Sequence, residues 1–320
     1  MSNGNLLGSS LPGIEFGNAI CYSGYRENQS PLSRQYPSYE EIREDLELLE
    51  FNWRYLRLYD SSRHAELVLQ VIANEGLNFQ VMLGCDMRAE ISNPNCPWGA
   101  EFAESRLAAN RLENRREVER MISLASHYPD LVFSVSIGNE ATVDWTDHLV
   151  PVESLLRHVD RIRSEIDHPV TFCENYVPWA DKLAPLAAEL DFISLHSYPV
   201  WEYHGIDSAL GYTQDNFYGV ARRYPNTPVV ITEAGWTTHS NGRGIEPANA
   251  SEELQASYYQ QLMEWSERER VLTFVFEAFD EPWKGSPDLM EPEKHWGIFT
   301  VDRKPKLAMQ GLYGQRLARP

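Results

Sequence analysis

Two glutamates, Glu140 and Glu233, each follow directly after a short apolar run. They lie in the segments Ser136-Ile-Gly-Asn-Glu140 and Thr232-Glu-Ala-Gly-Trp236. Cleavage of a glycosidic bond needs one carboxylic acid to protonate the leaving oxygen and one carboxylate on the other side of the anomeric carbon. We therefore predict that Glu140 is the acid/base and Glu233 the nucleophile of a retaining mechanism, with carboxyl groups about 5–5.5 Å apart. The alternative is that both are solvated charges at a protein rim.

Polar and aromatic residues near these glutamates are candidates for sugar binding. Asn139 precedes Glu140, where its amide can hydrogen-bond a sugar 2-hydroxyl, a contact that strengthens in the transition state. Tyr198 follows another apolar run, and we expect its hydroxyl to donate to the Glu233 carboxylate; a core tyrosine is the alternative. Flat rings can stack on the apolar faces of sugars, although core packing is the other possibility for each ring. The aromatic candidates are Tyr59, Tyr176, Trp179, Trp201, Trp236, Trp283 and Trp296.

A short strand, a polar loop and a helix recur along the chain. The predicted strands are Gly13–Asn18, Trp53–Tyr59, Phe79–Gly84, Val132–Ile137, Val170–Cys173, Phe192–His196, Val229–Thr232 and Val271–Phe276. Amphipathic segments predict helices at Tyr39–Glu50, Ala65–Glu75, Ala108–His127, Val152–Ile166 and Glu252–Glu267, with Pro151 and Ser251 as helix starts. This pattern predicts the α/β class and a single (β/α)8 TIM barrel, in which catalytic residues lie at the carboxyl ends of strands. Neither GxGxxG nor Walker A is present to support a nucleotide-binding fold.

One catalytic domain accounts for nearly the whole chain. We predict a flexible tail over residues 1–12 and a barrel domain over residues 13–315. The tract Asn93–Glu104 is predicted to be an elaborated loop of the barrel. The tail lacks the basic and apolar regions of a secretory signal, so either the protein is cytoplasmic, or it is secreted or periplasmic with a signal that precedes this sequence. No apolar run reaches the roughly 20 residues that span a bilayer.

The charge balance restricts the partners. The chain has 28 Lys and Arg against 47 Asp and Glu, a net charge of −19, which disfavours nucleic acid, anionic membranes and polyanionic substrates. A neutral polysaccharide or small sugar is compatible with it, and we expect a monomer. His196 and His204 stand in no metal-binding spacing, so no metal is expected. Four cysteines in a chain this long are expected as free thiols, with pairing of Cys85 and Cys96 as the alternative.

The motifs together resemble those of glycoside hydrolase family 17, which contains the β-1,3-glucanases and related glucanosyltransferases. The resemblance is to a bacterial-type member of that family. Ser136-Ile-Gly-Asn-Glu140 and Ile231-Thr-Glu-Ala-Gly-Trp236 are similar to that family's acid/base and nucleophile segments. Phe276-Glu-Ala-Phe-Asp-Glu-Pro-Trp-Lys284 and Arg57-Leu-Tyr-Asp60 extend the resemblance, which covers nearly all of Gly13 to Leu307.

The resemblance implies retention of configuration, β-1,3-glucan as substrate and no cofactor. It also implies that Glu281 and Lys284 are auxiliary residues near the catalytic pair, with a surface ion pair as the alternative. Glu277 is expected to support the barrel end by binding Arg57.

The prediction that follows is a retaining endo-β-1,3-glucanase acting on laminarin-like glucan. A β-1,3-glucanosyltransferase using the same glycosyl-enzyme intermediate is the nearest alternative, and a catalytically idle glucan-binding barrel is a more distant one. The first predicted strand and the Asn93–Glu104 loop depart from the plant members of the family. Both are expected to border the cleft, so the number of sugar subsites, and with it endo or exo action, stays open.

Overall fold

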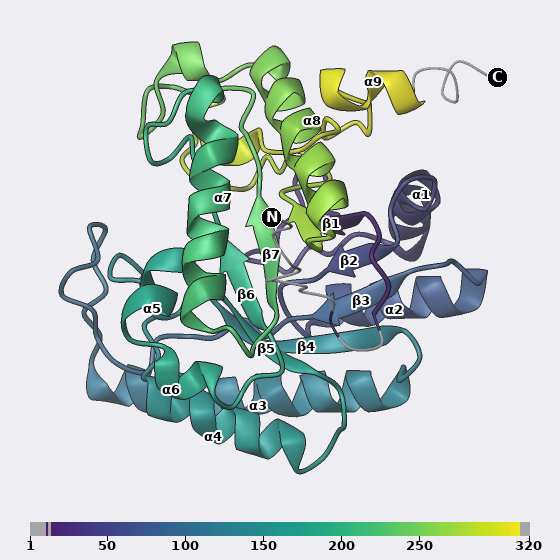
Figure 1. The fold of residues 1–320 in the computed structure, drawn as a ribbon. Coiled ribbons are helices and arrows are strands. Elements are labelled where there is room, and N and C mark those ends of the chain that lie inside the picture. Colours follow the sequence, from purple (N-terminus) through teal and green to yellow (C-terminus); the bar gives the residue numbers. More distant parts are fainter. Residues whose placement is uncertain (1–10, 12–13, 314–320) are drawn as a thin grey trace, which may run out of the picture.

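The computed structural model describes residue 11 and residues 14–313 of the 320-residue chain. In this part, eight parallel strands close into a barrel in sequence order, and the last strand pairs with the first. The predicted single (β/α)8 barrel is therefore confirmed (Figure 1). The strands are β1 Ala19–Cys21, β2 Tyr55–Arg57, β3 Gln80–Leu83, β4 Val132–Asn139, β5 Val170–Asn175, β6 Ile193–His196, β7 Val229–Ala234 and β8 Thr273–Val275.

Helices surround the barrel and pack beside their sequence neighbours, as α1 does on α2, α3 on α4 and α7 on α8 (Figure 1). The α-helices are α1 Tyr39–Leu49, α2 Arg63–Glu75, α3 Glu104–His127, α4 Val152–Arg163, α5 Tyr176–Asp181, α6 Ala184–Ala187, α7 Ile206–Arg223, α8 Glu252–Glu269 and α9 Leu307–Tyr313. Two short 3-10 helices, η1 Pro247–Asn249 and η2 Pro292–Lys294, lie in the loops that follow β7 and β8. The five helices predicted from periodicity are all present.

Helix starts follow the expected chemistry of the chain. Ser38 caps α1 and forms a reciprocal capping box with Glu41. Ser251, a predicted start, accepts the backbone N–H of Leu254 at 3.2 Å and begins α8. These local signals fix where the helices begin, and thereby the lengths of the loops that carry the site.

The first strand is the one element that the sequence pattern placed wrongly. Residues 14–18, within the predicted strand Gly13–Asn18, are partly buried except for Glu15, which is exposed, whereas Ala19–Cys21 is buried throughout and pairs with both β2 and β8. Burial on both faces selects the shorter, more apolar run. The predicted tail, except for Leu11, lies outside the described residues. Gly13 and the predicted domain end at residue 315 also lie outside them.

Small polar side chains are buried within several barrel strands beneath the site. The Cys21 thiol donates to the Thr232 carbonyl at 3.2 Å, and the Thr171 hydroxyl donates to the Ser194 hydroxyl at 2.8 Å. This arrangement leaves room for Arg57, which is buried at the end of β2. An arginine in the barrel centre supplies positive charge directly below the strand ends.

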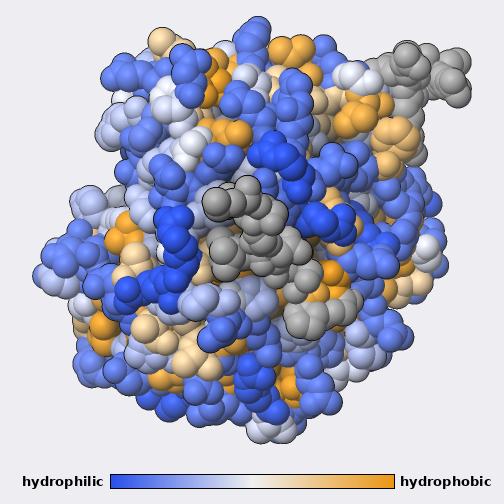
Figure 2. Space-filling model, viewed as in Figure 1, coloured by the Kyte–Doolittle hydropathy of each residue, from blue (hydrophilic) through white to orange (hydrophobic). Residues whose placement is uncertain are grey.

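The outer surface agrees with the acidic composition. Figure 2 shows that the face of the molecule seen in Figure 1 is largely hydrophilic, with hydrophobic residues scattered over it. No helix within the described residues is both long and apolar enough to cross a bilayer. The four cysteines are buried free thiols, so the prediction of free thiols is confirmed and Cys85 does not pair with Cys96.

Candidate active site

Glu233 lies on β7, and positively charged side chains surround its carboxylate. Its side chain is 6% exposed, and one carboxylate oxygen accepts a hydrogen bond from Arg57. The other oxygen accepts the Tyr198 hydroxyl at 2.5 Å, which is the contact predicted for Tyr198. Burial opposes ionisation, but the charges of His196 and Arg57 and the Tyr198 hydrogen bond outweigh it and lower the pKa of Glu233 to about 2. Glu233 is therefore held as a carboxylate, the form that a nucleophile needs.

Glu140 follows β4 and faces open space. Its backbone has a φ of +45°, in the left-handed region that a non-glycine residue rarely adopts, and its N–H donates to the Cys173 carbonyl at 2.9 Å. Its side chain is 29% exposed, and its carboxylate accepts His196 Nδ1 at 3.0 Å. Such backbone strain is often found at functional sites. The turn directs the carboxyl group of Glu140 toward Glu233 instead of along the strand.

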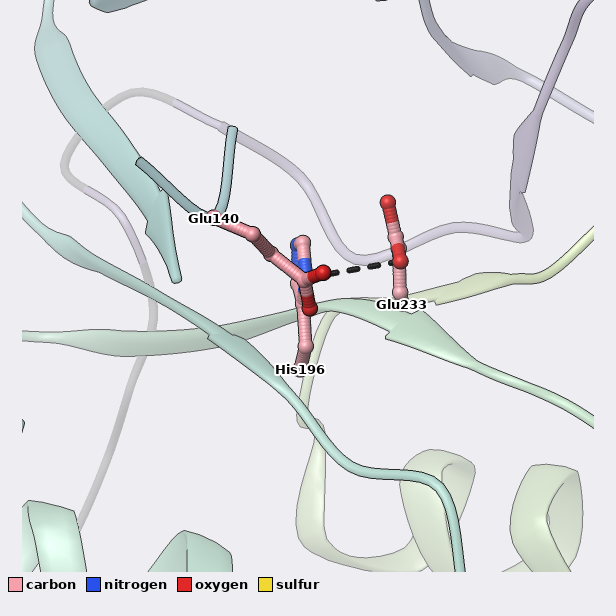
Figure 3. A group of neighbouring side chains, drawn as sticks. All are labelled: Glu140, His196 and Glu233. Carbon is pink, nitrogen blue, oxygen red and sulfur yellow. Dashed lines mark hydrogen bonds and ion pairs between the residues drawn. The ribbon is translucent and has the colours of Figure 1, made fainter. Parts of the chain in front are cut away.

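His196 joins the two glutamates, and this role was not foreseen from the sequence. Its Nδ1 atom lies 3.0 Å from a Glu140 oxygen and 3.3 Å from a Glu233 oxygen (Figure 3). Burial disfavours its charged form, yet the Glu233 charge and the hydrogen bonds of Cys173 and Glu140 raise the pKa of His196 to about 10. His196 is thus a buried cation between two carboxyl groups. Its position at the carboxyl end of β6 was the available signal, because the catalytic glutamates also lie at strand ends.

The carboxyl groups of the pair are close together. One oxygen of each glutamate and the His196 nitrogen all lie within 4.8 Å of one another. Retaining glycosidases keep their carboxyl groups about 5–5.5 Å apart, and inverting ones about 6.5–9.5 Å. The observed spacing fits the shorter separation of retaining enzymes, in which the carboxylate attacks the sugar directly.

These three side chains also carry atoms of the kinds that bind metals, and among the described residues they form the one cluster close enough to share an ion. Two features disfavour a metal here. Both Glu233 oxygens already accept hydrogen bonds, from Arg57 and Tyr198, and the raised pKa of His196 keeps a proton on its ring nitrogens. The donor set fits an imidazolium between carboxylates better than a zinc site, which requires neutral histidine. His204 is not part of the cluster.

Asn139 is held in place from both sides. Its side-chain oxygen accepts a hydrogen bond from Arg57, and its carbonyl accepts His148 Nε2 at 2.9 Å. Because the oxygen is occupied, the amide N–H₂ remains as the donor on the cleft side, as the predicted contact with a sugar 2-hydroxyl requires. Arg57 therefore bridges Asn139 and Glu233. The expectation that Arg57 binds Glu277 is wrong.

Glu174, on β5, fixes the turn that carries Glu140. Its buried carboxyl group accepts the Thr142 N–H at 2.8 Å, the Thr142 hydroxyl at 2.7 Å and the Asn175 N–H at 2.7 Å. Burial and the nearby charge of Glu140 raise the pKa of Glu174 to about 7 despite these hydrogen bonds. A buried carboxyl group with a pKa near neutral thus lies behind Glu140.

The segment after β8 contributes a buried charge cluster. Lys284 Nζ lies 2.8 Å from a Glu277 oxygen and 2.5 Å from a Glu281 oxygen, and all three side chains are largely shielded from solvent. Burial and Glu281 raise the pKa of Glu277 well above its ordinary value, although Lys284 acts in the opposite direction. The surface-ion-pair alternative for Glu281 and Lys284 is therefore excluded. Glu281 also accepts the Trp283 indole N–H at 2.9 Å, so the cluster positions a ring at the cleft.

A cleft of about 1060 Å³ opens over Glu140 and Glu233. Its walls carry eleven of the predicted catalytic and sugar-binding candidates: Tyr59, Asn139, Glu140, Tyr176, Tyr198, Trp201, Glu233, Glu281, Trp283, Lys284 and Trp296. Sequence reasoning missed His148, Trp98, Trp145 and Tyr212 as cleft residues.

Trp236, another predicted sugar-binding residue, does not line the cleft. It is buried, its indole N–H donates to the Asn249 carbonyl at 2.7 Å, and its ring packs on Tyr258. The cause is Gly235, where the backbone passes so close to Phe276 that an added Cβ would lie 2.0 Å from the Phe276 carbonyl oxygen. The chain therefore turns beneath β8 and sends Trp236 into the core. Trp179 is likewise a core ring, bonded to the Ser194 carbonyl.

A (β/α)8 barrel whose mouth holds two glutamates this close, one fixed as an anion and one open to a cleft, has the machinery of a glycoside hydrolase. A family model described as the BtgE/BtgC glycoside hydrolase domain matches residues 19–297, and the chain belongs to this family. The predicted kinship with glycoside hydrolase family 17 is confirmed.

Two curated relatives are named glucan 1,3-beta-glucosidase. The one from Arthroderma benhamiae is 26% identical over 194 residues, 55% of this chain and 61% of the relative, so this chain spans less than two thirds of that protein. The one from Schizosaccharomyces pombe is 24% identical over 277 residues, 82% of this chain and 78% of the relative. Among solved structures, an endo-laminarinase from Formosa is similar at 26% identity and a TM-score of 0.81, covering 100% of this chain and 91% of the laminarinase.

Proposed function

We propose that this protein is a retaining endo-β-1,3-glucanase that hydrolyses laminarin-like glucan. The observation that carries the proposal is the catalytic pair itself. Glu233 is kept anionic by Arg57 and Tyr198, and Glu140 lies within reach of it on the open side of the cleft. The site residues belong to this chain alone, and the double-displacement chemistry that they support needs no cofactor.

In the first step Glu140 donates its proton to the glycosidic oxygen while a Glu233 oxygen attacks the anomeric carbon. The bond from that carbon to the leaving oxygen breaks, the shortened chain departs with the proton, and a glycosyl ester forms on Glu233. Asn139 donates its amide to the 2-hydroxyl as positive charge develops on the sugar ring. Arg57 and His196 lose a counter-charge when the ester forms, and this change favours the later return of the carboxylate.

In the second step Glu140, now ionised, takes a proton from water as the water oxygen attacks the anomeric carbon. The ester bond breaks, Glu233 regains its charge and the product leaves with the β-configuration. Tyr198 stays positioned to donate its hydroxyl to the returning carboxylate. The configuration at the anomeric carbon is inverted twice and is therefore retained overall.

The substrate assignment is supported by the comparisons with known proteins, by the net charge and by the volume of the cleft. The family match, the relatives named glucan 1,3-beta-glucosidase and the similarity to an endo-laminarinase all favour a β-1,3-glucan. A net charge of −19 suits a neutral polymer that a monomeric enzyme can approach without repulsion. The cleft exceeds the roughly 300–1,000 Å³ of common small-molecule pockets, as binding of several glucose units requires.

Time-resolved analysis of the products from laminarin tests this proposal. We expect a mixture of oligosaccharides from the earliest time points, and proton NMR should show the β-anomer first. Glucose as the only early product would mean exo action, and products longer than the starting chains would mean the glucanosyltransferase alternative. An initial α-anomer would contradict retention.

A further inference from the structure

Two tryptophans on the cleft wall expose unusual amounts of indole surface. Trp98 is 59% exposed and Trp145 is 38% exposed, and both line the cleft that contains the catalytic pair. Trp98 lies in the loop between β3 and α3, and Trp145 lies in the loop between β4 and α4. Large rings usually lose solvent contact on folding because burying them is favourable. Exposed rings inside a cleft are therefore candidates for ligand contact.

Hydrogen bonds connect the two loops to each other. Asn93 is buried, and its amide donates to the carbonyls of Asp144 at 2.9 Å and Thr146 at 2.7 Å. The Glu90 N–H donates to the Leu149 carbonyl at 2.9 Å. Buried amide hydrogen bonds of this kind hold the loops in one arrangement. The exposed rings therefore stand on a fixed wall.

A chain of hydrogen bonds connects this wall to the acid/base. The Asp147 carboxylate, in the same loop as Trp145, lies 2.8 Å from His148 Nδ1. His148 Nε2 lies 2.9 Å from the Asn139 carbonyl, one residue before Glu140. Both ring nitrogens face acceptors, which favours the doubly protonated form of the ring. In agreement, hydrogen bonds to Asp147 and Asn139 raise the pKa of His148 although burial opposes the charge.

We propose that Trp98 and Trp145 form a distal glucosyl-binding subsite, which holds a glucose unit of the same glucan chain whose scissile bond lies between Glu140 and Glu233. This inference rests on the proposed function. The occupant is argued from continuity, because one cleft contains the tryptophan pair and both glutamates. Indole faces match the apolar C–H faces of glucose, and the fixed wall sets the distance from ring to scissile bond. The subsite makes activity depend on the chain length of the substrate.

The test compares kcat/KM over laminari-oligosaccharides of increasing length for the wild type and for Trp98→Ala, Trp145→Ala and the double variant. For the wild type we expect a step upward in kcat/KM at the length that first reaches the wall. The single variants should lose about tenfold on the longer substrates and on laminarin, and less than twofold on the shortest cleaved substrate. Trp98→Phe, which keeps a ring, should recover most of the step.

Controls and contrary results are well defined. Leu289→Ala removes an exposed apolar side chain that does not line the cleft and should match the wild type at every length. Equal losses of the tryptophan variants at all lengths would mean that the wall only supports Asn139 and Glu140. Unchanged activity on laminarin would also overturn the subsite. A wild type that cleaves no glucan would remove the proposed function, and the subsite with it.

Discussion

The two glutamates that we propose as the catalytic pair occupy opposite environments at the same barrel mouth. On the β7 side, Glu233 is 6% exposed and both of its oxygens are bonded, to Arg57 and to Tyr198. On the β4 side, Glu140 is 29% exposed, and His196 is the one hydrogen-bond partner of its carboxyl group within the part of the chain that the structure describes. One side chain is enclosed by positive charge, whereas the other is open to the cleft.

This difference teaches that environment, and not residue type, divides the work between two identical side chains. A carboxylate surrounded by cations and a donated hydroxyl keeps its charge until it attacks carbon. A carboxyl group that faces the cleft can exchange protons with a leaving oxygen and then with water. His196 belongs to both sides, since its Nδ1 atom reaches both carboxyl groups.

The enclosed side, at Glu233, offers the most direct test of the difference between the two glutamates. In Glu233→Gln the nucleophilic oxygen is lost, and we expect kcat on laminarin to fall by about 10⁴-fold or more. The amide still accepts from Arg57, so binding of oligosaccharide should persist. Initial rates and isothermal titration calorimetry measure the two quantities. Turnover close to that of the wild type would end the assignment of Glu233.

On the open side, Glu140→Ala should have an effect that depends on the leaving group. We expect a loss of about 10²–10⁴-fold on laminarin, because natural leaving oxygens need protonation. An activated aryl β-glycoside of a short laminari-oligosaccharide needs no such help in the first step, so a glycosyl-enzyme should accumulate, and added azide should release it. Equal losses on both substrates, without azide rescue, would contradict the acid/base role.

Much of this comparison was predictable from the sequence. Strand positions follow from apolar runs, and a polar residue that ends a buried strand is conspicuous, so Glu140 and Glu233 were found together with Asn139 and Tyr198. The first strand was misplaced because Ala19–Cys21 is too short to stand out from its neighbours. Closure of the barrel selects that segment through pairing with two strands, and pairing is not visible in a local pattern.

The partners of charged residues were harder to predict. The sequence offers several carboxylates as possible partners of Arg57. Only the barrel geometry decides that Arg57 forms an ion pair with Glu233 and that Glu277 forms one with Lys284. His196 was considered solely as a metal ligand, because its approach to two glutamates depends on how three strand ends converge. Trp236 was misassigned because the contact of Gly235 with Phe276 redirects the chain after β7.

His196, which contacts both glutamates, tests how much a shared cation contributes to the difference between them. His196→Asn keeps a hydrogen-bond donor near the position of Nδ1 but removes the cation, and we expect kcat to fall by about 10- to 100-fold. Burial raises the pKa of Glu233, and His196 is the first of the charges that lower it to about 2. Without this cation the pKa rises, so the acidic limb of kcat/KM against pH should move to higher pH. An unmoved limb would mean that His196 only fills space; His168→Asn, outside the cleft, is the control.

Glu174→Gln should have the smallest effect on activity, less than about tenfold, because the side chain contacts the turn of Glu140 and not the substrate. Its effect on stability should depend on pH. The pKa of Glu174 is raised from 4.5 to about 7, chiefly by burial and then by Glu140. A group with a raised folded pKa contributes stability below its unfolded pKa and loses that contribution as pH rises through the folded value.

The wild type should therefore lose up to about 3 kcal/mol from this group between pH 4.5 and pH 7, a loss that the variant avoids. Urea unfolding at pH 5 and pH 8 measures the change: the stability of Glu174→Gln relative to the wild type should increase toward pH 8. Thr142→Val removes a hydroxyl that donates to the Glu174 carboxylate and lowers its pKa, so in this variant the loss of stability should extend to higher pH than in the wild type. Parallel pH profiles of Glu174→Gln and the wild type would mean that Glu174 does not titrate in the folded protein over this pH range.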